Sequence, residues 1–159
     1  NALPREFRTA VEAGIQDALI TGVLANYSLI DVGVTVCGGA FDEKSSTETA
    51  FHTAGLMAAR EASKAAKPVI LEPIMKVEII TPTEHMGDVL GDVNARRGQV
   101  KEMTQREVVH IIRALVPLAE LFGYSTAIRS ITRGRASYTM EPAHFDVVPE
   151  GIKQQLLTR

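Results

Sequence analysis

The sequence lacks the features of several protein classes. It has one cysteine, Cys37, in 159 residues, which excludes an internal disulfide and fits a reducing compartment. Its longest apolar runs, such as Val108 to Leu115, are interrupted by charged or polar residues and fall far short of the ~20 residues that a membrane-spanning helix needs. No charged-then-apolar signal segment opens the chain. We therefore expect a soluble, cytoplasmic protein with no membrane partner.

Neither sign of charge dominates. Seventeen Lys and Arg stand against nineteen Asp and Glu, a net charge of −2, so any RNA contact must be local rather than the result of a global basic field. The four histidines lie too far apart for a metal site, and no metal is expected (His52, His85, His110 and His144). The fractions of charged and hydrophobic residues, 23% and 45%, are ordinary for a packed chain of one or two domains.

Catalytic motifs are also missing. The sequence has no phosphate loop, no Gly-x-Ser-x-Gly elbow, no His-Glu-x-x-His and no Gly-x-Gly-x-x-Gly fingerprint. An enzymatic hypothesis rests on Cys37 alone, and no histidine lies nearby in sequence to raise its thiolate fraction. We interpret Cys37 as a strand-end residue, and Gly87 and Gly91 as helix positions that permit close packing on a sheet. We expect no catalytic residue and no cofactor in this chain.

The first part of the chain is predicted to contain two helices. Apolar spacing favours a helix from Pro4 to about Thr21 and a second helix that follows a capping box of Ser45 and Glu48 and stops at Pro68. Between them, Tyr27 to Cys37 is typical of a strand. The part has few strands, so its sheet is short of partners, as if an N-terminal portion were missing. A short terminal helix is expected from Pro149 to Leu157.

The second part is predicted to have the order β-α-β-β-α-β. An extended run from Val69 to Ile80 comes first, and a break between two units is expected within it at Glu72-Pro73. A helix follows, which begins with Thr81, Pro82 and Glu84 and ends at Gly98. The remaining elements are strands around Gln99–Met103 and Glu107–Val116, a helical stretch from Pro117 to Gly134, and a strand from Arg135 to Glu141. Each helix leads to an Arg-Gly pair and a strand. Two such half-units favour an α+β, two-layer, ferredoxin-like arrangement, with an antiparallel sheet and both helices on one face.

Two features could contact RNA. The loop from Gly38 to Ser46 holds one aromatic residue, Phe41, which could stack on a nucleobase or fold back onto the core. Five arginines gather at the two helix ends: Arg96, Arg97, Arg129, Arg133 and Arg135. They could form a phosphate-facing rim or simply complement the helix C-terminal dipoles, and spacing alone favours the second reading.

Long motifs carry a resemblance to a known family. Four stretches resemble the C-terminal part of elongation factor G: EPIMKVE from Glu72, HMGDVLGDVNARRG from His85, VPLAELFGYST from Val116 and RSITRGRASYTME from Arg129. PREFRTAVEAGI from Pro4 and PEGIKQQLLTR at the end extend the resemblance to essentially the whole chain. It implies that residues 1–72 plus 146–159 are part of domain IV, with a partial fold similar to ribosomal protein S5 domain 2, and that residues 73–145 are the ferredoxin-like domain V.

The resemblance implies a part of a translational GTPase that moves tRNA and mRNA through the ribosome or assists its recycling. GTP and magnesium would be bound by N-terminal GTPase domains of the parent protein, so this part would have no catalytic residue or cofactor of its own. Its partners would be the ribosome, tRNA and mRNA, and those GTPase domains. A ribosomal protection protein-type paralogue is an alternative within the family, and a stand-alone ferredoxin-like ligand-binding module is an alternative outside it.

The resemblance also implies two RNA-contacting segments. The domain IV tip, which in the family reaches the decoding centre, would comprise Gly38, Gly39, Ala40, Phe41 and Asp42. Asp42 stands where the family has histidine, and a carboxylate is repelled by RNA phosphate. The domain V segment, which in the family leans on the sarcin–ricin loop of large-subunit rRNA, would comprise Arg129, Ser130, Thr132, Arg133 and Arg135. The resemblance favours RNA binding for this rim and a packing or capping role for Arg96 and Arg97.

Overall fold

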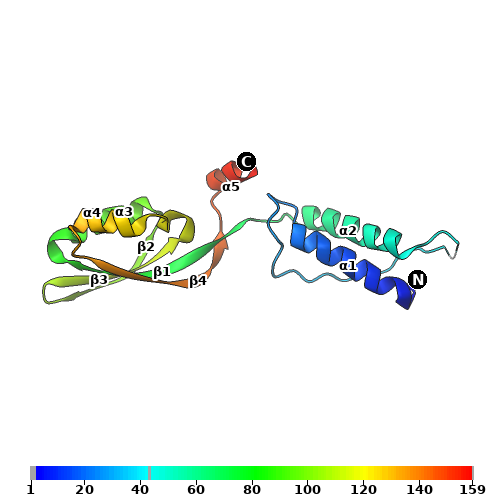
Figure 1. Cartoon of the computed structure of the whole chain (residues 1–159), viewed down its shortest axis with the longest axis horizontal. Helices are drawn as coiled ribbons and strands as arrows, with labels where there is room; N and C mark the ends of the chain where they lie inside the picture. Colours follow the sequence, from blue (N-terminus) through cyan, green and yellow to red (C-terminus); the bar gives the residue numbers. More distant parts are fainter. Residues whose placement is uncertain (1–2, 43, 159) are drawn as a thin grey trace. The chain divides into compact units, whose positions relative to one another are not determined.

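The computed structural model describes residues 3–42 and 44–158 and divides into two compact units. The first unit comprises Asn1–Ile70 and Pro149–Arg159, and the second comprises Leu71–Val148. Figure 1 shows the helices of the first unit and the sheet and helices of the second. The units divide where β1 begins and just after β4 ends. The domain boundaries that the resemblance implies stay a prediction.

Two helices form the body of the first unit, α1 (Arg5–Thr21) and α2 (Glu48–Ala65), and they lie side by side in Figure 1. Glycines allow the close approach. A Cβ added at Gly14 would lie 2.0 Å from the carbonyl oxygen of His52, and one at Gly55 would lie 2.6 Å from that of Val11. A small core of Leu3, Val11 and Phe51 fills the unit, with Phe7 packed against it. A third helix, α5 (Glu150–Leu157), confirms the predicted terminal helix.

The predicted strand from Tyr27 to Cys37 is wrong in the described part of the chain. The segment carries no strand pairing there, and Asp31 takes a left-handed conformation with φ of 56°. Alternate apolar residues, as at Val32, Val34 and Val36, stay about half-exposed. The alternating pattern is that of a strand, but a strand forms only where a neighbour supplies hydrogen bonds. The pattern therefore marks a strand-forming segment that has no partner among residues 3–42 and 44–158.

The predicted capping box is also displaced. Thr47, not Ser45, is the N-cap of α2, and its Oγ1 accepts a hydrogen bond from the backbone N–H of Ala50 at 3.2 Å. The hydroxyl of Ser46 instead accepts from the backbone N–H of Asp42 at 3.0 Å. Several serines and threonines precede this helix, and only backbone geometry decides which one caps it.

The second unit is built on a four-stranded antiparallel sheet with strand order β2-β3-β1-β4. The strands are β1 (Leu71–Pro82), β2 (Gln99–Arg106), β3 (Val109–Pro117) and β4 (Ser137–Val147). Helices α3 (Met86–Ala95) and α4 (Tyr124–Thr132) cross one face of the sheet, as Figure 1 shows, each preceded by a short 3₁₀ turn, η1 (Thr83–His85) or η2 (Leu118–Leu121). The predicted order β-α-β-β-α-β and the α+β fold class are confirmed.

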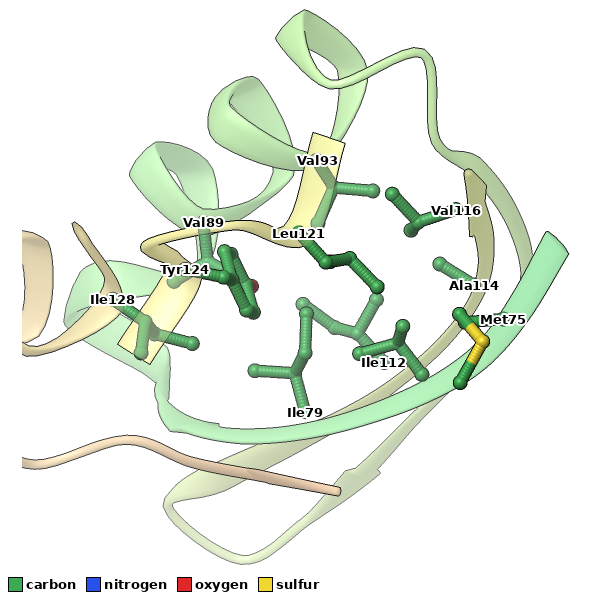
Figure 2. Close-up of a cluster of buried hydrophobic side chains, with 11 residues drawn as sticks. Met75, Ile79, Val89, Val93, Ile112, Ala114, Val116, Leu121, Tyr124 and Ile128 are labelled. Carbon is green, nitrogen blue, oxygen red and sulfur yellow. The ribbon is translucent and has the colours of Figure 1, made fainter. Parts of the chain in front are cut away.

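Alternation along the central strands places one face of the sheet in the core. Val77 and Ile79 of β1 and Ile112 of β3 are fully buried, and they meet Val89 of α3 and Ile128 of α4 among others (Figure 2). The alternate residues of each strand point to the other face of the sheet, which α3 and α4 do not cover. These regular burial patterns are what fix the sheet register, because a shift of one residue would expose the entire apolar set.

Ion pairs cross the strands on the uncovered face of the sheet. Arg113 of β3 donates from Nε to Glu78 of β1 at 2.7 Å and from Nη1 to Glu102 of β2 at 2.8 Å, and Lys76 pairs with Glu141 at 2.8 Å. The hydrogen bond from Arg113 lowers the pKa of the Glu102 carboxyl, as that from Lys76 lowers the pKa of Glu141. Arg113 and Lys76 are therefore less available to bind phosphate.

Several predicted boundaries in the second unit are wrong. The two units divide between Ile70 and Leu71, two residues before the predicted break at Glu72-Pro73, and β1 runs through Glu72 and Pro73. The ladder to β3 begins only at Ile74, so the missing N–H of Pro73 costs no bond to β3. Thr81 and Pro82 end β1, and α3 begins at Met86 rather than after Thr81. Gly87 and Gly91 do not permit close packing, because an added Cβ would meet nothing within 4 Å at either position.

No helix in the described ranges is both long enough and apolar enough to cross a membrane.

Candidate nucleic-acid interface

The two helices of the second unit end in the same way. Arg97 and Arg133 both follow a helix and take left-handed conformations, with φ of 57° and 52°. In each case the next residue closes the turn: Gly98 donates its N–H to the carbonyl of Val93, and Gly134 to that of Arg129, both at 2.8 Å. For a residue with a side chain this conformation is unfavourable by roughly 1–2 kcal/mol, which glycine avoids. Arginine is therefore held at both ends against the local backbone preference.

At the end of α3, the cations are bound by the protein itself. Arg97 donates from Nη1 and Nη2 to the two carboxylate oxygens of Glu72, at 2.7 and 2.9 Å, and from Nε to Glu120 at 2.9 Å. The hydrogen bonds to Glu72, whose side chain is 12% exposed, raise the pKa of the Arg97 guanidinium above its ordinary value. Arg97 therefore ties η2 to β1 and is not available for phosphate.

Arg96 is bound in the same region. It pairs with Asp92 at 2.9 Å, donates to the backbone carbonyl of Glu120, and lies over the ring of Tyr124, 5.0 Å from its centroid. A guanidinium stacked on an aromatic face and paired with a carboxylate stabilises the packing around it. These contacts agree with the packing or capping role that the resemblance favours for Arg96 and Arg97.

At the end of α4, the cations face solvent. Arg129 and Arg133 are exposed and make no ion pair with any residue that the structure describes. Arg135 is also exposed and pairs through Nη1 with Glu84 of η1. Ser130 is exposed beside them. We call Arg129, Ser130, Arg133 and Arg135 the arginine rim; it concentrates three guanidinium groups at a helix C-terminus, where the helix dipole favours cations.

Thr132 does not belong to this surface. Its side chain is 0% exposed, its Oγ1 donates to the carbonyl of Ile128 at 2.7 Å, and the same oxygen accepts from the N–H of Ala136 at 3.1 Å. The prediction that Thr132 contacts RNA is wrong, because its hydroxyl is used inside the protein. It shapes the turn that presents the arginine rim.

The loop from Gly38 to Ser46 in the first unit is exposed at all five predicted tip positions: Gly38, Gly39, Ala40, Phe41 and Asp42. The ring of Phe41 lies 6.5 Å from that of Phe7, which stacks on Phe51 at 4.4 Å, so Phe41 leans toward the helices while 46% of it stays exposed. Glu43 lies outside the described residues.

The carboxylate of Asp42 has a structural use. Its Oδ1 accepts a hydrogen bond from the backbone N–H of Lys44 at 2.8 Å, while the N–H of Asp42 donates to Ser46. The first of these bonds forms an Asx turn, in which an Asp side chain accepts from the backbone N–H two residues later. One carboxylate oxygen of Asp42 is therefore directed into the loop.

A cavity of about 430 Å³ lies in the first unit, lined in part by Leu3, Val11 and Val36 with Arg8 and Glu12. Arg8 is already engaged through a hydrogen bond from Nε to the carbonyl of Leu3 at 3.1 Å. Cys37 lines the same cavity and is an exposed free thiol. In the described residues, no group of three His, Cys, Asp or Glu could hold a metal ion. The cavity lies in the first unit, not in the ferredoxin-like second unit. It therefore does not support the alternative that the protein is a stand-alone ferredoxin-like ligand-binding module.

Sequence reasoning missed the acidic partners that distinguish the two helix ends. Glu72, Glu84 and Glu120 decide which arginines are bound, yet Glu72 lies 25 residues from Arg97 and Glu84 lies 51 residues from Arg135. Spacing carries no signal for such pairs, because the sheet topology brings them together.

Comparisons with known proteins agree with this architecture. The family model "Elongation factor G, domain IV" matches residues 1–67, and "Elongation factor G C-terminus" matches residues 69–156. A crystal structure of a protein from Thermus thermophilus is similar over 99% of this chain, with a TM-score of 0.84 and 35% identity. This chain covers 24% of that protein's length. The chain is similar to the C-terminal part of an elongation factor and belongs to the elongation factor G family.

Proposed function

We propose that this chain is the ribosome-binding part of an elongation factor G-like translational GTPase and that the arginine rim contacts ribosomal RNA. In this proposal the rim lies against the sarcin–ricin loop of the large subunit, and the loop around Phe41 reaches the decoding centre, beside tRNA and mRNA. GTP hydrolysis, with its magnesium ion, belongs to N-terminal domains of the parent protein. Translocation and recycling both require the factor to be seated on the ribosome, which is the step assigned to this chain. The factor acts in the cytoplasm.

The observation that carries the proposal is the difference between two equivalent helix ends. Both hold arginine in a left-handed conformation, but Arg97 is bound by Glu72 and Glu120, whereas Arg133 has no carboxylate partner in the described part of the chain. Backbone strain is tolerated where it serves packing or function. At Arg97 the ion pairs account for it, and at Arg133 we assign it to binding of an external anion. Arginine forks bind phosphate through paired hydrogen bonds, so RNA is a suitable partner.

The first unit contributes the second contact in this proposal. The exposed loop is short of cations, so it would not drive affinity. Its half-exposed Phe41 ring offers an apolar surface for a base, and its serines offer hydrogen-bond donors. We also propose that the extended segment with Val32, Val34 and Val36 pairs with a strand from elsewhere in the parent protein, which would complete the domain IV-like sheet. Such pairing would satisfy the backbone groups that the segment leaves open.

The substitution Arg133→Gly tests the proposal, because it separates stability from binding. Glycine adopts the left-handed conformation without strain, so the free energy of unfolding should stay unchanged or rise by up to about 1 kcal/mol. Loss of one phosphate contact should weaken ribosome binding about five- to tenfold near 0.1 M salt. Thermal or denaturant unfolding measures the first effect, and co-sedimentation with purified ribosomes measures the second.

The matched control is Arg97→Gly at the equivalent position. It leaves the poorly exposed Glu72 carboxylate without its partner, so unfolding should become easier by about 2–3 kcal/mol, while the ribosome affinity of the folded protein should stay within twofold. The proposal is contradicted if Arg133→Gly binds ribosomes as tightly as the unaltered chain, or if both variants lose affinity in parallel with stability.

A further inference from the structure

Resting on the proposed function, we propose that Glu84 regulates the arginine rim by holding Arg135 in place of RNA phosphate. Glu84 acts as an internal competitor: the carboxylate occupies the guanidinium of Arg135 in the free protein, and a phosphate displaces it on binding. The affinity of the rim is therefore set below the value that three available arginines would give.

The contacts around Glu84 fit such an exchange. Its Oε1 contacts Nη1 of Arg135, and the same oxygen lies 3.4 Å from Nε2 of His85. The 3₁₀ turn that carries Glu84 is fixed to the β2–β3 hairpin, because the backbone N–H and the hydroxyl of Thr83 both donate to the carbonyl of Val108, at 3.1 and 3.2 Å. The backbone that carries Glu84 therefore stays in position when Arg135 leaves the carboxylate.

The exposure of the pair allows phosphate to compete. The side chains of Glu84 and Arg135 are both 56% exposed, and exposed ion pairs are only weakly stabilising. Arg97 shows the opposite arrangement, with two carboxylates and a side chain that is 27% exposed. A phosphate can thus displace Glu84 from Arg135 at small cost, whereas Glu72 and Glu120 keep Arg97 permanently occupied.

The test is ribosome binding by the variant Glu84→Gln. Removing the carboxylate frees Arg135 and removes its repulsion of phosphate, so affinity near 0.1 M salt should rise about fivefold. The dependence of log affinity on log salt should stay nearly the same, because Arg135 contacts phosphate in both complexes and no phosphate contact is added. The control is Asp88→Asn, which makes the same change in net charge one turn away; Asp88 is exposed and pairs with no cation in the residues described. It should change affinity less than twofold.

A double-mutant comparison identifies the pair as the cause. In an Arg135→Ala background, Glu84→Gln should give less than half of its gain, because the arginine that it releases is absent. Equal gains in both backgrounds would overturn the inference, as would unchanged or weakened binding by Glu84→Gln alone. In either case the proposed function stands if Arg133→Gly still weakens binding; if Arg133→Gly has no effect, the rim itself is rejected, and the two failures are distinguishable.

Discussion

Replacing Arg129, Arg133 and Arg135 together with alanine is expected to weaken binding of this chain to ribosomes by about 100-fold or more near 0.1 M salt. Each guanidinium that neutralises a phosphate releases counterions, and this release is worth roughly one power of ten in affinity at that salt concentration. Three lost contacts should also reduce the slope of log affinity against log salt by about two to three. Co-sedimentation across a salt series measures both quantities.

The matched control for the triple variant removes three cations from the sheet of the same unit. Lys76, Lys101 and Arg106 lie on β1 and β2, and their replacement with alanine makes the same change in net charge. We expect affinity within about threefold of the original value, since long-range effects of exposed charges are screened by salt. Equal losses for the two triple variants would mean that net charge alone governs binding, which would exclude the arginine rim as a specific contact.

The second large effect is expected from Gly14→Ala in the first unit. The new Cβ would lie 2.0 Å from the carbonyl oxygen of His52, and no change of rotamer can relieve a clash with backbone. Helices α1 and α2 must separate, which should cost about 3 kcal/mol or more, at the upper end of the range for overpacking. Denaturant unfolding and loss of the first unit's protection from hydrogen exchange measure the effect.

The control is Gly91→Ala in α3 of the second unit. An added Cβ there meets nothing within 4 Å, and the helix interior prefers alanine, so the free energy of unfolding should rise by about 0.5–1 kcal/mol. If the two glycine variants have similar stabilities, the close packing of α1 on α2 at Gly14 is wrong.

The order of elements in the second unit was predictable because its signals are local. Alternation along Val77 and Ile79 and helical spacing around Val89 and Val93 report directly on burial. The exact extent of β4 was not predictable, because most of this edge strand is exposed and its outer residues follow no apolar alternation. The strand prediction in the first unit was wrong for a different reason. The apolar alternation after Tyr27 is present, but no strand that pairs with it lies among the described residues.

The candidate site was predictable in kind and not in detail. Sequence identified arginines at two helix ends, and it could not tell that Arg97 is bound while Arg133 is exposed, since the difference arises from carboxylates brought in by distant strands and turns. Thr132 was assigned to the surface because it lies within the RNA-contacting motif. Its burial follows from its position on the inward face of α4 beside Ile128.

The two units are proposed to bring different segments to different ribosomal RNAs, and directed hydroxyl-radical cleavage can locate both contacts in one experiment. The single exposed cysteine, Cys37, takes an iron chelate beside the tip loop, and the variant Cys37→Ser with Ser130→Cys takes it within the arginine rim. The first probe should cut small-subunit rRNA at the decoding centre, and the second should cut large-subunit rRNA at the sarcin–ricin loop. Identical cleavage patterns from the two positions, or no cleavage of the large-subunit loop from the rim, would contradict this division of contacts.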